Sequence, residues 1–115
     1  MKKLTNLVVR DTDCSNKAVK KLKKRFRNIE KDYMAFVNSI ENDNDLGVHL
    51  GDNVYKVRIV NSDKNAGKSG GYRLITYLKL IENELYLLFI YDKSDFENIS
   101  ESEIDSLILS SALFS

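Results

Sequence analysis

The chain of 115 residues contains one cysteine, one histidine, no proline and no tryptophan. A single cysteine, Cys14, excludes an intramolecular disulfide and a cysteine-rich zinc site, and it favours the reducing cytoplasm as the place where the protein acts. No apolar run is long enough to span a bilayer; the run LYLLFIY at 85–91 has the length of a strand. A secretory signal pattern is also missing. We therefore expect a cytoplasmic protein with no membrane partner.

The charged residues are balanced in number but not in position. Lysine and arginine together number 18, and aspartate and glutamate 17, so the net charge of +1 indicates no class of partner. The bases are concentrated in residues 17–31, where the only acid is Glu30, and acids dominate after Tyr91. A near-neutral protein with one strongly basic segment can still bind a polyanion locally. The basic residues that we single out in this segment are Lys20, Lys21, Lys23, Lys24, Arg25 and Arg27.

The first half of the chain has mainly helical periodicity. Residues 4–9 form a short candidate strand, and from 15 to 40 apolar side chains recur at helical spacing. This stretch fits two helices better than one, with a break near Arg27 and Asn28, where the asparagine would cap the second helix. Turn-forming residues up to Gly47 end the helical part.

Three closely spaced strands are predicted in the second half, at residues 54–60, 72–80 and 85–91. Parallel neighbours would need longer connections, so we expect an antiparallel meander. Because side chains alternate along a strand, Lys56 and Arg58 should lie on the face opposite to Tyr55, Val57 and Ile59.

A capped helix is predicted near the C-terminus. Ser100 and Glu103 have the Ser-x-x-Glu spacing of a capping box. The apolar residues of this helix would form one face: Ile104, Leu107, Ile108 and Ala112. The predicted order is β-α-α-β-β-β-α, an α+β fold with a helical pair on one face of a small antiparallel sheet and a short C-terminal helix. We expect residues 1–115 to form a single domain.

The stretch NAGKSGGYRL, residues 65–74, holds three glycines between predicted strands. Its centre, GKS at 67–69, resembles the end of a nucleotide-binding P-loop. The first glycine of that motif would fall at Ser62, and a strand rather than a helix follows, so the P-loop interpretation fails. The simplest alternative is a flexible hairpin loop in which Gly70 and Gly71 supply positive φ angles and the lysines are solvated.

That alternative is weakened by the residues on the flanking strands. Lys56 and Arg58 precede the loop, Arg73 follows it, and Tyr91 and Lys93 end the next strand. In a meander these side chains would converge on one end of the sheet.

Three motifs occur in order along this part of the chain: Lys-x-Arg at 56–58, Gly-Lys-Ser-Gly-Gly-x-Arg at 67–73 and Ile-Tyr-x-Lys at 90–93. With these motifs the sequence resembles the RelE/ParE superfamily of bacterial toxins, most closely its HigB-like branch. The resemblance is specific over residues 55–104, while the N-terminal part agrees only in the type of its elements.

The resemblance implies a toxin of a type II toxin–antitoxin system. Such toxins are ribosome-dependent endoribonucleases (mRNA interferases), which inhibit translation by cleaving the message in the ribosomal A site. The resemblance also implies a cognate antitoxin, expected to carry a helix-turn-helix domain, which suppresses the toxin until the antitoxin is degraded. No metal or cofactor is expected.

Metal-free RNA cleavage requires activation of the ribose 2′-OH, stabilisation of added negative charge on the phosphate, and protonation of the leaving 5′-oxygen. A pair of catalytic histidines is excluded because His49 is the only histidine; it lies away from the motifs and is expected to be structural or on the surface. The acids lie in the C-terminal segment, apart from the Lys/Arg motifs, so a two-metal site is poorly supported.

A cationic site with a tyrosine remains. Arg73 is expected to grip phosphate oxygens and to stabilise charge in the transition state. Lys56, crowded by the positive charges of Arg58 and Lys68, is our candidate for the general base, with Tyr91 as the alternative. Tyr91 would otherwise stack on a base of the message. Arg58 and Lys68 are expected to bind RNA phosphate.

Lys93 and the basic segment 17–31 each have two interpretations. Lys93 would protonate the leaving group or only bind phosphate. The basic segment 17–31 is either a solvated helix face or a surface that attracts ribosomal RNA, and the resemblance favours the second.

Two further functions remain open at this level. One is a non-enzymatic inhibitor of DNA gyrase, as in the ParE branch, although that branch generally lacks such a set of motifs. The other is an inactive relic that binds RNA without cutting it.

Overall fold

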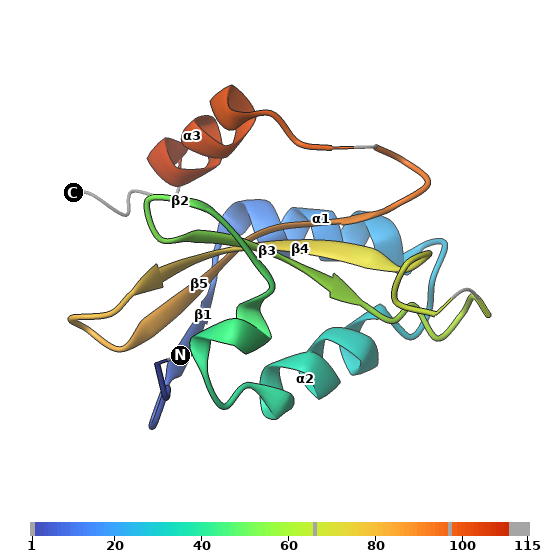
Figure 1. Ribbon diagram of the computed structural model, residues 1–115. Helices are drawn as coiled ribbons and strands as arrows, with labels where there is room; N and C mark the ends of the chain where they lie inside the picture. The colour runs from blue at the N-terminus through green and yellow to red at the C-terminus, as the bar shows by residue number, and fades with distance from the viewer. Residues whose placement is uncertain (1, 66, 97, 111–115) are drawn as a thin grey trace.

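The computed structural model describes residues 2–65, 67–96 and 98–110 (Figure 1). Its elements follow one another as β1 (Val8–Asp11), α1 (Asp13–Lys23), α2 (Ile29–Ser39), a 3-10 turn (Asp43–Leu46), β2 (Val48–Gly51), β3 (Val54–Ile59), β4 (Tyr72–Lys79), β5 (Glu84–Asp92) and α3 (Glu101–Ser110). The α+β class and the predicted order of helices and main strands are confirmed.

The strands form one five-stranded sheet in the order β1-β5-β4-β3-β2. The predicted meander of β3, β4 and β5 is present, with both pairs antiparallel. Two edge strands make the sheet larger and mixed, which corrects the expectation of a small antiparallel sheet. β1 pairs in parallel with β5, and β2 pairs antiparallel with the first half of β3. β2 was missed because it has only four residues, all exposed, and the alternation of Val48, His49 and Leu50 is too short to predict a strand by itself.

The start of the chain also departs from the predicted strand at 4–9. Leu4 is buried in the core, and its N–H donates to the carbonyl of Glu41 at 2.9 Å. The strand itself begins at Val8. Leu4 and Leu7 pack against the core before the strand begins, which gave the same apolar signal as a strand.

Helices α1 and α2 form the predicted pair, with corrections at their starts. Helix α1 begins at Asp13, because Thr12 and Ser15 form a reciprocal capping box. Asn28 precedes α2 but makes no capping bond. Its backbone N–H and side-chain amide instead donate to the carboxylate of Asp63, each at 3.0 Å, since a charged acceptor binds these donors more strongly.

The sheet is covered on both faces (Figure 1). On one face, Leu22 of α1 and Ile29 of α2 belong to a buried cluster with residues of β3, β4 and β5. On the other, Ile104 and Ile108 of α3 pack with Ile75 and residues of β3 and β5. We call these the α1–α2 face and the α3 face.

Helix α3 begins as the sequence predicts. The N–H of Glu103 donates to Ser100 Oγ at 3.2 Å, which caps the helix. Leu107 is partly buried beside Ile104 and Ile108. Ala112, the last residue of the predicted apolar face, lies outside the described residues.

Candidate functional site

Three of the candidate site residues lie in one row across the sheet, which we call the arginine row: Arg58, Arg73 and Tyr91. Arg58 of β3 pairs with Arg73 of β4, and Arg73 pairs with Tyr91 of β5. Lys56 pairs with Ile75 and is two residues from Arg58, so it lies in the next row on the same face. The strand register therefore brings Lys56, Arg58, Arg73 and Tyr91 together on the α3 face, as the motifs suggested.

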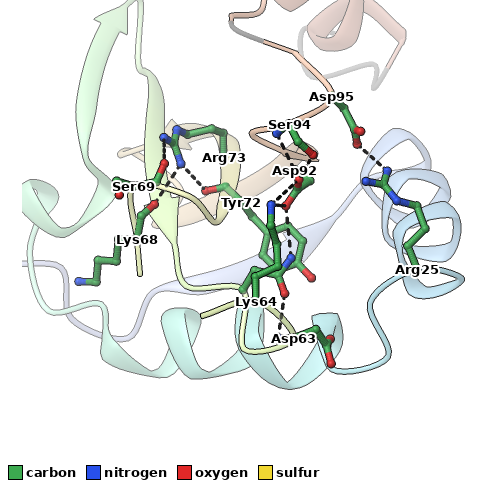
Figure 2. Close-up of polar contacts among 11 residues, drawn as sticks. Arg25, Asp63, Lys64, Lys68, Ser69, Tyr72, Arg73, Asp92, Ser94 and Asp95 are labelled. Atoms are coloured by element: carbon green, nitrogen blue, oxygen red, sulfur yellow. Dashed lines mark hydrogen bonds and ion pairs between the residues drawn. The ribbon is translucent and has the colours of Figure 1, made fainter. Parts of the chain in front are cut away.

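The guanidinium group of Arg73 is bonded to the glycine loop (Figure 2). Its Nη1 donates to the carbonyls of Lys68 and Tyr72 at 3.1 and 3.2 Å, and its Nη2 to the carbonyl of Ser69 at 2.9 Å. The residue is only 7% exposed. This differs from the open phosphate clamp that the sequence led us to expect: in this conformation Arg73 fixes the path of the loop, and its charge lies beside Tyr91.

Two glycines of the loop have different backbone requirements. Gly67 has a positive φ angle of 65°. At Gly71 a Cβ atom would lie 2.1 Å from the carbonyl oxygen of Ile59. Gly71 is therefore required by the close approach of two backbones, and the prediction that it supplies a positive φ angle was wrong.

Tyr91 is buried between other aromatic rings. It is 1% exposed, and its hydroxyl group has no hydrogen-bond partner among the described residues. Phe96 meets its ring edge-on, with centroids 5.4 Å apart and an interplanar angle of 85°. Burial raises the pKa of Tyr91, and the positive charge of Arg73 opposes that rise. The net shift keeps the phenol protonated, and neither face of the ring is open to an RNA base.

The remaining cationic candidates are more accessible. Lys56 is partly buried, and its Nζ donates to Asn98 Oδ1 at 3.0 Å, in the segment between β5 and α3. Arg58, Lys68 and Lys93 are exposed. Lys56 is thus partly protected from solvent beside the arginine row, while the side chains of Arg58, Lys68 and Lys93 are in solvent.

A groove of 590 Å³ runs beside the part of β3 that β2 leaves uncovered. Its lining includes Lys56, Arg58 and Lys68 together with Asp32 and Phe36 of α2. A second cavity of 770 Å³ lies between the β2–β3 turn and α3, and its lining includes none of the candidate site residues. The groove along β3 is therefore the one that coincides with the cationic motifs.

Sequence reasoning missed a buried ion pair behind the site (Figure 2). Asp92 is fully buried, and Lys64 Nζ donates to its two carboxylate oxygens at 3.1 and 2.9 Å. Asn61 and Ser94 also donate to this carboxylate. Burial by itself would raise the pKa of Asp92, but the hydrogen bonds from Ser94, Lys64 and Asn61 outweigh it and hold the pKa below its ordinary value. The available signal was the alternation of β5, which places Asp92 on the same face as the apolar Ile90.

The chain was compared with protein-family models. The model described as RelE toxin of RelE / RelB toxin-antitoxin system matches residues 14–114. The chain belongs to the RelE toxin family. It is thus a toxin of a type II toxin–antitoxin system, and membership of the RelE family implies an antitoxin partner. A comparison with curated proteins finds no match.

No helix within residues 2–65, 67–96 and 98–110 has the length and apolar character needed to cross a membrane. The same part of the chain contains no group of three or more His, Cys, Asp or Glu side chains arranged to hold a metal ion.

The basic residues singled out in the sequence lie on α1 and on the turn that follows it. In this RelE toxin all of them are exposed. Arg25 forms an ion pair with Asp95 at 2.8 Å, and Lys23 one with Glu30 at 3.1 Å. The others, Lys20, Lys21, Lys24 and Arg27, form no ion pair with described residues. His49 lies on β2, as a surface residue, with its ring stacked on Tyr55 at 4.8 Å.

Proposed function

We propose that this RelE-family toxin is a ribosome-dependent mRNA endoribonuclease of the HigB-like branch, acting in the cytoplasm. The observation that supports this best is the cross-strand row of Arg58, Arg73 and Tyr91 with Lys56 beside it. The two arginines of this row suit a phosphate that gains negative charge during cleavage. An exposed arginine and an exposed lysine at the groove beside β3 suit the first contact with RNA.

In the proposed reaction Lys56, as the neutral amine, takes the proton from the ribose 2′-OH and becomes the ammonium ion. The 2′-oxygen attacks the adjacent phosphorus, and the bond to the 5′-oxygen breaks. Tyr91 is less suited to be the base, because its raised pKa disfavours the phenolate. Arg58 and Arg73 supply positive charge to the phosphate, and Lys93 is our candidate for protonating the leaving 5′-oxygen.

The hydrogen bond between Lys56 and Asn98 has to break before the message reaches Lys56. Asn98 accepts the hydrogen bond from Lys56 Nζ, and Phe96 covers Tyr91. A charged phosphate oxygen is a stronger hydrogen-bond acceptor for Lys56 Nζ than a neutral amide oxygen. Bound RNA can therefore compete with Asn98 for Lys56.

The proposed partners follow from the charge distribution and the family. The exposed bases of α1 and the following turn would bind ribosomal RNA, which gives a salt-dependent and sequence-independent attraction. The antitoxin is proposed to carry a helix-turn-helix domain. No cofactor is proposed.

A translation assay beside a gyrase assay tests the proposed function. The purified toxin should stop synthesis of a reporter in a cell-free system while gyrase in the same buffer still supercoils plasmid DNA. Inhibited supercoiling with normal translation would show the alternative, a gyrase inhibitor.

A further inference from the structure

Burial of Tyr91 leaves the site without the aromatic platform that the sequence assigned to it. Single-stranded RNA is usually held by stacking of splayed bases on aromatic rings. Tyr91 is 1% exposed. A different ring would have to take this role, and it would have to present a face to solvent close to Lys56 and Arg58.

Phe96 is the candidate, because it is exposed and its ring contacts Tyr91, which lies in the row with Arg73 and Arg58. It is 49% exposed, and among the described residues it is the one aromatic side chain in the set of exposed large hydrophobics. Its ring lies 5.4 Å from that of Tyr91 and 6.5 Å from that of Phe89, centroid to centroid. A single exposed apolar side chain needs no explanation. An exposed aromatic ring that contacts Tyr91 of the arginine row is a more specific arrangement than a lone exposed apolar side chain.

The segment that carries Phe96 is held on both sides. Asp95, directly before it, forms the 2.8 Å ion pair with Arg25 at the basic end of α1. Asn98, two residues after it, bonds to Lys56 at 3.0 Å. These two contacts link the segment of Phe96 to Lys56 and to the basic end of α1. A nucleobase of the RNA stacked on Phe96 would therefore lie at the rim of the site.

We propose that Phe96 is the stacking platform for a base of the message next to the cleaved bond. This inference deepens the proposed function and rests on it for the identity of the RNA. It assigns binding to Phe96 and leaves Tyr91 as the buried support beneath the platform.

The test compares Phe96→Leu with Phe96→Trp on ribosomes carrying a defined message. In single-turnover cleavage, Phe96→Leu should raise the half-saturating toxin concentration about 10-fold, the size expected for loss of one base–aromatic stack, with little change in the maximal rate. Phe96→Trp should restore wild-type behaviour, because it keeps a stacking face. Ile81→Ala, at a fully exposed position in the β4–β5 turn, is the control for loss of an exposed apolar side chain.

Binding is measured separately on a message whose A-site riboses are 2′-O-methylated and therefore cannot be cut. The 10-fold loss for Phe96→Leu and its recovery in Phe96→Trp should recur in the dissociation constant. If the wild type binds in this aromatic-dependent way but cuts no message, the stacking inference holds and the proposed function fails.

Two results would overturn the inference while leaving the proposed function in place. One is cleavage with the same half-saturating concentration in the leucine variant as in the wild type. The other is an equal loss in the leucine and tryptophan variants, which would assign Phe96 a packing role only.

Discussion

The ammonium group of Lys64 lies 2.9 Å from the carboxylate of Asp92, a side chain with no exposed surface. The pair joins the loop after β3 to the last residue of β5, directly after Tyr91 in the row with Arg58 and Arg73. Asn61 and Ser94 complete the set of donors around the same carboxylate. The buried carboxylate of Asp92 therefore lies on the face of the sheet opposite to Tyr91 and supports the site from that face.

Replacing Asp92 with Asn should lower the free energy of unfolding by about 3 kcal/mol at pH 7, because the ammonium group of Lys64 would lose its charged partner. Chemical denaturation measures the effect. The folded-state pKa of Asp92 lies below its unfolded value, so its contribution is complete above about pH 4 and is lost as the pH falls through the lower folded value. The difference between wild type and variant should therefore shrink in acid.

The surface pair of Lys79 and Glu82, 3.1 Å apart, is the matched control. Glu82→Gln should leave the midpoint of unfolding unchanged, since exposed pairs contribute little. An Asp92→Asn variant as stable as the wild type at pH 7 would contradict the proposed importance of the buried pair.

Gly71→Ala should destabilise the fold by about 3 kcal/mol, because its Cβ atom would overlap the carbonyl oxygen of Ile59. Gly67→Ala is the comparison: its surroundings are open, and the cost is limited to about 1 kcal/mol for a positive φ angle. Denaturant unfolding of both variants gives the two values. Equal costs would show that the loop lies differently in solution.

Arg73→Ala and Arg73→Lys should both reduce cleavage about 100-fold, since a lysine cannot replace the fork that holds three carbonyl groups. Hydrogen exchange at the N–H of Gly71, which donates to the carbonyl of Lys68, should become faster in both variants. Arg10→Ala, which removes an exposed arginine paired with Glu84 on the edge strand β1, should retain full activity. Full activity of Arg73→Lys would show that only the charge of Arg73 matters.

The alternation of apolar residues was enough to predict the meander and the common face of Lys56 and Arg58. Alternation is too weak a signal for β2, which has only four residues, all exposed. It also does not locate β1, which joins the sheet by pairing with a strand far along the chain. Strand pairs of that kind depend on tertiary packing rather than on local sequence.

The direction of individual site side chains was less predictable. The sequence shows that Arg73 lies just after the glycine loop. It does not show where the guanidinium group points, because the hydrogen bonds of that group depend on the orientation of the loop carbonyls. Phe96 lies in a segment without periodicity, so its contact with Tyr91 could be found only once that segment was placed over the sheet.

Replacing Lys20, Lys21 and Lys24 with Gln should weaken ribosome binding without changing the cleavage pattern. The slope of log K against log salt should become shallower by about 0.7 for each lost phosphate contact. Binding titrations at several salt concentrations measure it, with Lys79→Gln as the control for a lysine already paired with an acid. An unchanged slope would identify these lysines as a solvated helix face.

The central claim is ribosome-dependent cleavage at the arginine row. The most direct test maps the 5′ ends of a defined message after incubation with the toxin, with and without programmed ribosomes. The account predicts new ends within the A-site codon, present only with ribosomes and lost in Arg73→Ala. Ends that appear equally without ribosomes, or that persist in Arg73→Ala at the wild-type rate, would contradict it.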